Sequence, residues 1–305
     1  MKITVVGAGN VGATCAMRLL EGDLGDIVLI DIAGGIAQGK AEDLMDAASL
    51  LGHTKNIIGS SDYALTKESD IVVITAGFPR KPGMTREELF LKNAAVVGEV
   101  SSKVVEYSKD PIIIVVTNPL DIMTHLAWKT SKLNKRRVLG MAGCLDSSRM
   151  NLIASRVLNK DLYDVDSLVL GTHGETMVPA SSHSKVDKVN FDSSLSKDLI
   201  SDIVDKTKAR GAEIVSYLGS GSAYYAPSAG VYRMVKAIIE DSQEILPCSC
   251  LLEGEYGIDG IFLGIPAQLG KDGISEIIEL PLSDTENALL KNAADSLRSQ
   301  ISILE

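Results

Sequence analysis

Hydrophobic residues in the first half of the chain form short, almost uninterrupted runs that are separated by stretches of mixed polarity. Each run is rich in Ile and Val, and the runs comprise residues 2–6, 27–30, 71–74, 112–116 and 138–139. Apolar runs without polar alternation are typical of parallel strands that are buried on both faces. Apolar positions at helical spacing lie between them, notably in residues 86–107 and 122–132. This alternation predicts an α/β fold with a doubly wound parallel sheet.

The pattern changes after about residue 144. Longer amphipathic stretches predict helices over residues 146–158, 197–218, 225–240 and 283–304. Two further runs, residues 244–253 and 260–270, have the character of strands. The second half of the chain is therefore expected to be an α+β domain. We predict two domains, residues 1–144 and residues 145–305.

A glycine-rich loop follows the first predicted strand directly. Gly7-Ala8-Gly9-Asn10-Val11-Gly12 fits the spacing G-x-G-x-x-G, and the next residues, 13–20, have a helical apolar face. Gly7 permits the tight turn, Gly9 lets the backbone approach a pyrophosphate, and Gly12 lets the helix pack closely on the strand. Free N–H groups at the start of the helix then face the phosphates. The motif predicts a Rossmann dinucleotide site; the alternative is a generic glycine-rich turn of an α/β domain.

The second predicted strand ends in Asp31, which follows Gly12 by 19 residues. A carboxylate at this point accepts hydrogen bonds from the ribose hydroxyls and repels a 2′-phosphate. Residues 32–35 contain no Arg that would compensate for this repulsion. The sequence therefore favours NAD over NADP as the cofactor.

Composition excludes several classes of function. The 305 residues carry a formal net charge of −10, which argues against nucleic acid or an anionic membrane surface as a partner. The four cysteines have no C-x-x-C spacing, so we expect reduced thiols, and Cys248 and Cys250 are expected to share one face of a strand. No spacing of Cys and His suggests a metal site. Without a signal peptide or a membrane-length apolar run, the sequence predicts a cytoplasmic protein.

His173 is the most informative candidate for chemistry. It is one of only four histidines and lies in Leu170-Gly171-Thr172-His173-Gly174, among small and flexible residues. An imidazole can give and take a proton at cellular pH. A lone histidine is more often structural or solvated, but here it accompanies the signature of a hydride-transfer cofactor.

A cationic loop follows the predicted strand 71–74. Residues 75–89 contain several Gly and Pro residues and three nearby cations, Arg80, Lys81 and Arg86. Open α/β sheets bind their ligands at the carboxyl ends of the strands. We expect this loop to close over an anionic ligand and exclude water; the alternative is a solvated surface turn.

Two shorter motifs supply further candidates. Asn118 ends a predicted strand, where its amide can contact cofactor and substrate, although an ordinary strand-ending turn is the alternative. Asp146 and Arg149 are three residues apart near a helix start and project from one face. Asp146 can orient an imidazole and stabilise its protonated form, and Arg149 can hold a carboxylate by a bidentate pair. Otherwise they are an early-turn carboxylate and a solvated surface residue.

In order and combination, these motifs resemble the lactate/malate dehydrogenase family, in particular its malate dehydrogenases of lactate-dehydrogenase-like type. The resemblance covers essentially the whole chain and rests on Asp31 and residues 7–12, 75–77, 79–86, 117–121, 145–149 and 171–174. It implies NAD-dependent, reversible hydride transfer between (S)-malate and oxaloacetate, a reaction of the tricarboxylic acid cycle. It also implies a homodimer or a homotetramer.

The resemblance assigns roles to individual positions. It implies that His173 donates and accepts the proton, that Asp146 is its partner carboxylate, and that Arg86 polarises the substrate carbonyl. Arg149 is implied as the clamp on the carboxylate beside the reacting carbon, and Asn118 as a contact of nicotinamide and substrate. The residues expected to bind the cofactor are Gly7, Gly9, Asn10, Val11, Gly12, Asp31, Asn93, Thr117 and Asn118.

Arg80 occupies the position where the family's malate dehydrogenases carry Arg and its lactate dehydrogenases usually carry Gln. The second carboxylate of oxaloacetate is costly to bury without a cation, and Arg supplies both charge and a fork geometry. Ala223 resembles the small residue that makes room for this carboxylate. Thr172, Glu175 and residues 180–190 depart from the family pattern, which affects the expected affinity and loop packing but not the chemistry.

Two alternatives remain open at this point. One is a lactate or other 2-hydroxy acid dehydrogenase. The other, from a different class, is a non-catalytic NAD-sensing protein, which needs the glycine loop and Asp31 but has no reason to combine His173, Asp146, Arg149 and Arg86.

Overall fold

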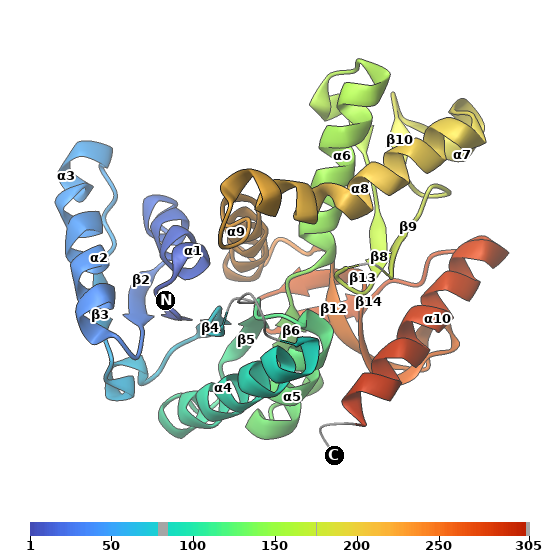
Figure 1. Cartoon of the computed structure of the whole chain (residues 1–305). Helices are drawn as coiled ribbons and strands as arrows, with labels where there is room; N and C mark the ends of the chain where they lie inside the picture. The colour runs from blue at the N-terminus through green and yellow to red at the C-terminus, as the bar shows by residue number, and fades with distance from the viewer. Residues whose placement is uncertain (79–84, 175, 303–305) are drawn as a thin grey trace. The chain divides into compact units, whose positions relative to one another are not determined.

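The computed structural model describes residues 1–78, 85–174 and 176–302, with the side chain of Arg86 left out. The chain folds into two compact units, each made from three stretches of sequence (Figure 1). The first unit comprises Met1–Met141, Tyr224–Glu244 and Leu269–Ser275, and the second comprises Ala142–Ala223, Ile245–Gln268 and Glu276–Glu305. The division into domains at residues 144 and 145 stays a prediction.

A parallel sheet of six strands forms the centre of the first unit. Its order is β3-β2-β1-β4-β5-β6, so the strand order reverses between β1 and β4. Neighbouring strands run parallel throughout, with Val5 opposite both Leu29 and Val73. The strands are β1 (Lys2–Val6), β2 (Asp26–Ile30), β3 (Ile57–Ser60), β4 (Ile71–Ile74), β5 (Ile112–Val115) and β6 (Val138–Gly140). The doubly wound parallel sheet predicted from the apolar runs is confirmed.

Complete burial explains why the central strands show no polar alternation. Every residue of β4 and β5 is buried, and the four side chains of β4 have no solvent-accessible surface. Burying one Ile or Val side chain stabilises a fold by roughly 1.5–3 kcal/mol relative to leaving it exposed. These strands therefore give a rigid support to the loops at their carboxyl ends.

Six helices accompany this sheet (Figure 1). They are α1 (Asn10–Glu21), α2 (Gly34–Asp46), α3 (Ala48–Leu51), α4 (Arg86–Tyr107), α5 (Leu120–Ser131) and α9 (Tyr225–Ile239). α1 packs beside α9, and α4 packs beside α5. A capping box starts α4: the Thr85 hydroxyl accepts from the N–H of Glu88 at 3.1 Å, and the Glu88 carboxylate accepts from the N–H of Thr85 at 3.0 Å.

The sequence pattern did not predict α2 or β3. α2 buries only Ala37 and Ala41, so its apolar stripe is too narrow to produce a clear helical period. β3 has only four residues, of which Ile57 alone is buried. The two elements pack against each other so closely that a Cβ on Gly59 would collide with the carbonyl oxygen of Ala37. Tertiary contact, not local periodicity, fixes these elements.

The second unit combines antiparallel strands with long helices. β8 (Val169–Gly171) pairs antiparallel with β9 (Met177–Pro179) and with β13 (Asp259–Gly270), and β12 (Glu244–Glu253) and β14 (Gly273–Ile277) also pair with β13. A small sheet has the order β11-β10-β7. Its strands are β7 (Val165–Asp166), β10 (Lys185–Val186) and β11 (Val189–Asn190). Residues 273–275 of β14 belong to the first unit and residues 276–277 to the second. The helices are α6 (Gly143–Leu158), α7 (Phe191–Ser194), α8 (Lys197–Leu218) and α10 (Asp284–Ile301). The predicted α+β character of this part is confirmed.

The described residues also form four short 3-10 helices: Tyr63–Thr66, Lys135–Arg137, Leu162–Asp164 and Glu255–Gly257. Several predicted bounds match the structure, among them α4, α8, β4 and β12. α1 begins at Asn10, three residues before its predicted start, because the last residues of the glycine motif are already helical. Cys248 and Cys250 share one buried face of β12, as predicted, with their sulfur atoms 3.6 Å apart.

A hydrophobic core fixes α6, the helix that carries Asp146 and Arg149. Met150 and Ile153 of α6 are buried together with Phe191 of α7 and Ile203 of α8. Phe191 and Ile203 have no accessible surface. Among the described residues, no helix has both the length and the apolar character needed to cross a membrane.

A buried carboxylate at the start of α10 ties this helix to the segment after β9. Glu286 is 5% exposed and accepts hydrogen bonds from the N–H and hydroxyl groups of Ser182, at 3.1 and 2.6 Å. It also accepts from the N–H and hydroxyl of Ser283, at 2.9 and 2.8 Å. Burial raises the pKa of Glu286, but these hydrogen bonds outweigh it and hold the pKa below its usual value.

Replacing Glu286 by Gln is expected to lower the free energy of unfolding at neutral pH by about 1–3 kcal/mol, since hydrogen bonds to a charged group are lost. A carboxylate whose folded pKa is depressed adds stability above its unfolded pKa of about 4.3, and this stability is lost as the pH falls through the folded pKa. The variant should therefore lose less stability on acidification than the wild type. Denaturant titration at several pH values measures this. Asp284→Asn, an exposed carboxylate of the same turn, is the control. Parallel pH curves for Glu286→Gln and wild type would exclude this role.

Candidate functional site

His173 lies on the short loop that joins β8 to β9. The loop is bounded by glycines in backbone conformations that L side chains rarely adopt, with φ of 80° at Gly171 and 142° at Gly174. The hydroxyls of Thr172 and Thr176 lie 2.6 Å apart and share a hydrogen bond across the loop. Thr172, which departs from the family pattern, therefore helps to hold the loop in the turn that carries His173.

The imidazole of His173 is paired with the carboxylate of Asp146. Nδ1 of His173 lies 2.8 Å from Oδ2 of Asp146, and Asp146 is almost completely buried at the start of α6. A carboxylate accepts hydrogen bonds and has none to give, so Nδ1 is the nitrogen that donates. The pairing leaves Nε2 as the nitrogen that can exchange a proton, and the side chain of His173 is still 20% exposed.

Arg149 contacts the other oxygen of the same carboxylate. Its Nη1 lies 3.4 Å from Oδ1 of Asp146, and its side chain is 12% exposed. The Nε atom of Arg149 is buried without a hydrogen-bond partner in the described part of the chain. Burial lowers the pKa of the Arg149 guanidinium and Asp146 acts in the opposite direction. The site therefore holds a cation whose own partners leave part of its hydrogen-bonding capacity unused.

These three side chains form one group in the second unit, although 27 residues separate Asp146 from His173. They come together because α6 packs beside β8. Together they can exchange a proton at Nε2 of His173 and attract an anion to Arg149. The structure thus brings His173, Asp146 and Arg149 together, while their roles in proton transfer and substrate binding stay predictions.

The glycine loop of the first unit has the close packing that its motif requires. Gly7 has a φ of 106°, and a Cβ there would lie 2.7 Å from Oγ1 of Thr75. A Cβ on Gly12 would collide with the carbonyl oxygen of Gly7, so α1 packs directly against the turn. Apart from its chain neighbours, no described residue comes within 4 Å of the Cβ position of Gly9, which leaves open space there in the described part of the chain. Any larger residue at Gly7 or Gly12 would displace the loop from β1.

The start of α1 fits a negatively charged group. α1 begins at Asn10, no side chain caps its N-terminus, and its first turn contains no acidic residue. Within the described residues, the N–H groups of this turn and the positive end of the helix dipole therefore have no capping side chain and no acidic residue of the same turn beside them. This end of α1 follows β1, next to the point where the strand order reverses between β1 and β4. Open α/β sheets bind nucleotides at such a point.

Asp31 is held against the glycine loop. Its Oδ2 accepts a hydrogen bond from the N–H of Ala8 at 2.7 Å, and its Oδ1 accepts from the N–H of Ala33 at 2.9 Å. Each carboxylate oxygen has a second lone pair, so both can still accept from ribose hydroxyls. Lys40, which the sequence analysis did not single out, donates to the carbonyl oxygen of Ala8 at 2.6 Å. Its position in the unpredicted helix α2 explains why no motif indicated it.

Asn93 joins the loops that follow β4 and β5. It is buried; its Oδ1 accepts from the N–H of Phe78 at 2.7 Å, and its Nδ2 donates to the carbonyl oxygen of Asn118 at 2.8 Å. Thr117 adds a second link by donating to the carbonyl oxygen of Ala76 at 2.7 Å. Asn118 is exposed at the carboxyl end of β5. The bridging by Asn93 was not foreseen, because it depends on tertiary contacts; contact of Asn93 and Thr117 with the cofactor stays a prediction.

Several predicted site residues lie outside what the structure describes. Arg80 lies outside the residues that the structure describes, and so does Glu175, which departs from the family pattern. For Arg86, only the backbone position at the start of α4 is described. Ala223 is described and lies half-buried after α8. In the described part of the chain, no cluster of three or more His, Cys, Asp or Glu side chains suits a metal ion.

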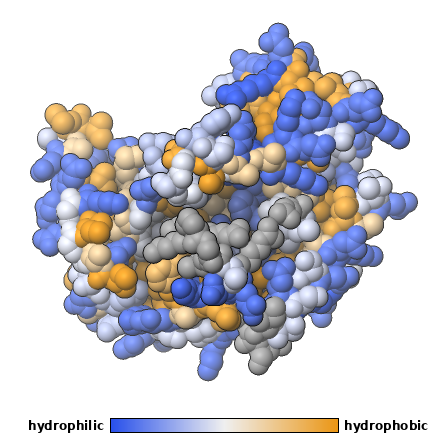
Figure 2. Space-filling model, viewed as in Figure 1, coloured by the Kyte–Doolittle hydropathy of each residue, from blue (hydrophilic) through white to orange (hydrophobic). Residues whose placement is uncertain are grey.

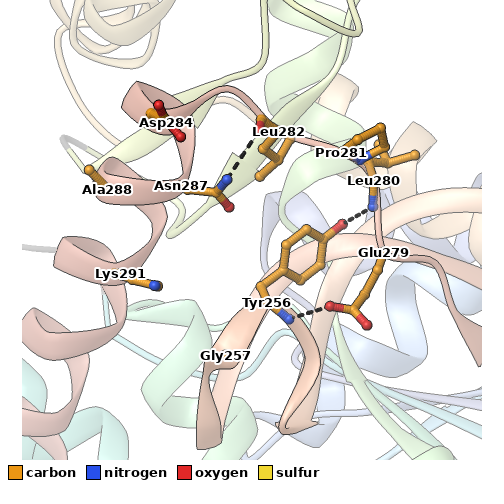
Figure 3. A pocket seen from close by; sticks show the side chains of 10 residues that line it. All are labelled: Tyr256, Gly257, Glu279, Leu280, Pro281, Leu282, Asp284, Asn287, Ala288 and Lys291. Carbon is orange, nitrogen blue, oxygen red and sulfur yellow. Dashed lines mark hydrogen bonds between the residues drawn. The ribbon is translucent and has the colours of Figure 1, made fainter.

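A separate cavity of about 560 Å³ lies in the second unit (Figure 3). Tyr256 forms one wall: its hydroxyl donates to the carbonyl oxygen of Ile278 at 2.8 Å and accepts from the N–H of Leu280 at 3.0 Å. Lys291 of α10 points toward the same cavity. The cavity shares no residue with the group around His173, and the hydrogen bonds of Tyr256 give it a structural role in fixing the segment before α10.

A dinucleotide-binding sheet, together with a histidine paired to a buried carboxylate, defines the class of NAD-dependent oxidoreductases. The family models agree with this class. Residues 1–140 match the NAD binding domain of lactate/malate dehydrogenase, and residues 144–304 match the alpha/beta C-terminal domain of lactate/malate dehydrogenase. The chain belongs to the lactate/malate dehydrogenase family.

Named relatives cover the whole chain. A malate dehydrogenase of Chlorobium chlorochromatii is 47% identical over 306 residues, which cover 100% of this chain and 99% of that protein. Among solved structures, malate dehydrogenase from Salinibacter ruber matches with a TM-score of 0.95 and 41% identity, over 100% of this chain and 97% of that one. Lactate dehydrogenase from Cryptosporidium parvum, solved with lactic acid and NAD, also gives a TM-score of 0.95, with 37% identity over 99% and 97% of the two chains. The fold alone therefore does not separate the two activities.

Proposed function

We propose that this chain is an NAD-dependent malate dehydrogenase that interconverts (S)-malate and oxaloacetate. The observation that carries the proposal is the hydrogen bond between Nδ1 of His173 and buried Asp146, with Arg149 on the same carboxylate. Membership of a family with an NAD binding domain supports NAD as the cofactor. Relatives named malate dehydrogenase support malate and oxaloacetate as the substrates. A purely cofactor-sensing protein has no need for this proton-transfer group.

In the direction of malate oxidation, His173 acts as the base. Its neutral imidazole accepts the hydroxyl proton at Nε2 while the C2–H bond breaks and the carbonyl forms. When bound, NAD supplies the acceptor for the hydride that leaves C2. The buried carboxylate of Asp146 stabilises the imidazolium that results, because opposite charges attract strongly where water is excluded. In the reverse direction, protonated His173 returns the proton to the carbonyl oxygen of oxaloacetate.

The arginines divide the work of substrate recognition. Arg149 binds the carboxylate beside the reacting carbon, and Arg86 polarises the carbonyl. Arg80 binds the second carboxylate, which malate has and lactate lacks. Guanidinium groups suit all three tasks because they stay charged and match carboxylates by two parallel hydrogen bonds.

A steady-state assay with NADH tests the proposal directly. The purified protein should oxidise NADH with oxaloacetate far more efficiently than with pyruvate, compared as kcat/KM. A preference for pyruvate would make the protein a lactate dehydrogenase, an activity that also occurs among its structural neighbours. Failure to turn over any 2-keto acid would contradict an enzymatic role altogether.

The cofactor preference rests on Asp31. We expect the wild type to use NADH and to discriminate against NADPH, because the Asp31 carboxylate repels a 2′-phosphate. Asp31→Ser combined with Ile32→Arg should shift the preference toward NADPH. The ratio of kcat/KM for the two cofactors measures the shift. Ile32→Arg alone is the control, since Ile32 is 97% exposed and the change leaves the carboxylate in place. A wild type that already uses NADPH as well as NADH would contradict this role of Asp31.

We also propose a cytoplasmic homodimer or homotetramer that serves the tricarboxylic acid cycle. Large apolar side chains support an oligomer: Ile36 of α2 and Leu50 and Leu51 of α3 are 55%, 85% and 60% exposed. Figure 2 shows hydrophobic surface in the region where Figure 1 places α2 and α3. Side chains of this size are usually covered when they occur together on a surface. Light scattering of the purified protein gives its mass and separates a dimer from a tetramer.

A further inference from the structure

The guanidinium group of Arg149 lies against α8. A Cβ on Gly211 would lie 3.6, 3.8 and 3.9 Å from Nη1, Nη2 and Cζ of Arg149. These are ordinary van der Waals distances, so the guanidinium packs on the helix where Gly211 leaves room for it. α6, which carries Arg149, and α8 are packed helices of the same unit.

Arg210 precedes Gly211 on α8, so a second arginine starts next to the point of the helix that Arg149 contacts. Arg210 is held by Glu213, with Nη1 of Arg210 2.7 Å from Oε2 of Glu213, and its side chain is 21% exposed. The hydroxyl of Tyr217 donates to the other oxygen of Glu213 at 3.0 Å. These residues follow one face of α8 at helical spacing. Arg210 is therefore fixed in orientation and not merely solvated.

The two guanidinium groups act on each other. Burial lowers the pKa of Arg149, Asp146 opposes this effect, and the positive charge of Arg210 lowers the pKa further. Asp146 also serves His173, and Glu213 is taken up by Arg210. Each guanidinium group therefore has one carboxylate as its partner, and Arg149 shares its carboxylate with His173, so an anion that binds at Arg149 is attracted by both cations.

We propose that Arg210 is a positioning residue that strengthens the binding of the substrate carboxylate by Arg149. A carboxylate at Arg149 relieves the repulsion between the two guanidinium groups, so part of that electrostatic energy is recovered as substrate affinity. Arg210 acts through Arg149 and takes no part in proton or hydride transfer. The inference rests on the proposed function, because it uses the assignment of Arg149 to the carboxylate beside the reacting carbon. That carboxylate is common to oxaloacetate and pyruvate, so both substrates are affected.

Arg210→Gln tests the inference in steady-state assays with NADH at several salt concentrations. We expect KM to rise about three- to tenfold for oxaloacetate and for pyruvate, since removing a nearby cation weakens the attraction of an anion. The value of kcat should stay within a factor of about two, as for the loss of an interaction made equally in ground and transition states. The salt dependence of kcat/KM should also become weaker, because one charge no longer attracts the substrate. Arg210→Lys retains the charge and should retain most of the affinity.

Lys206→Gln is the matched control. Lys206 lies one turn earlier on α8 and is also paired with an acidic residue, Asp202, at 2.6 Å. The Lys206→Gln variant should leave KM and the salt dependence of kcat/KM unchanged. This result would distinguish an effect of the position of Arg210 from an effect of the total charge of the helix. An unchanged KM in Arg210→Gln, or an equal rise in Lys206→Gln, overturns the inference while the wild-type activity still stands. A wild type without turnover of any 2-keto acid contradicts the proposed function instead.

Discussion

His173→Asn is expected to lower kcat by about 10²–10⁴-fold while leaving the affinity for NADH nearly intact, the usual scale for losing a general acid–base group. Asparagine keeps a polar side chain of similar reach but cannot carry the proton between substrate and solvent. The glycine loop, Asp31 and the start of α1 belong to the other unit, so the cofactor contacts expected there should survive. Fluorescence titration with NADH and steady-state kinetics with oxaloacetate measure the two effects separately.

His183→Asn is the control for this change. His183 is bonded to the carbonyl oxygen of Pro281 at 3.1 Å and lies outside the group around His173. Its replacement should leave kcat close to the wild-type value. Asp146→Asn should be severe as well, because the imidazolium loses its buried counter-charge and Nδ1 is no longer directed by a carboxylate. A His173→Asn enzyme that keeps most of its kcat would rule out the proton-transfer role.

The parts of the fold that the sequence predicted are those where local pattern and tertiary burial agree. Residues 71–74 and 112–115 are apolar throughout and are buried on both sides, so their runs could be recognised without knowing their neighbours. The glycine motif is equally local, since Gly7 and Gly12 are required by close packing within one strand–turn–helix unit. By contrast, α2 and β3 depend on their contact with each other at Ala37 and Gly59, which no periodicity reveals.

The same distinction applies to the site. Asp146 and His173 could be named from their motifs. Their pairing could be expected, because an imidazole that transfers protons needs a carboxylate that orients it and stabilises its protonated form. The hydrogen bonds that link Asn93 to Phe78 and Asn118 could not be expected from the sequence. Their partners are backbone N–H and C=O groups, which are present whatever the residue type. Lys40 was missed for the same reason, since its partner is the carbonyl oxygen of Ala8. Hydrogen bonds to backbone atoms leave little trace in a sequence.

We expect the choice between the two substrates to depend on a separate residue, Arg80, which lies outside the described part of the chain. Structural neighbours of both activities match this chain with a TM-score of 0.95, so the shape of the fold does not decide it. We expect one residue of the sequence to decide it, because oxaloacetate and pyruvate differ by one carboxylate. A carboxylate that leaves water must meet a cation, and Gln cannot replace the charge of Arg.

Arg80→Gln is therefore expected to lower kcat/KM for oxaloacetate. The decrease should correspond to a loss of roughly 2–5 kcal/mol of transition-state binding free energy, the usual result of removing one partner of a buried charge pair. Activity with pyruvate should hold or rise, because an unpaired cation no longer faces the methyl group. Two further variants serve as comparisons. Arg149→Gln should weaken both substrates alike, since it removes the clamp on the shared carboxylate, and Arg86→Gln should chiefly lower kcat. The decisive measurement is the ratio of kcat/KM for the two acids in each variant. If Arg80→Gln lowers both acids equally, Arg80 is a general residue of its loop, and the assignment of malate as substrate loses its main physical support.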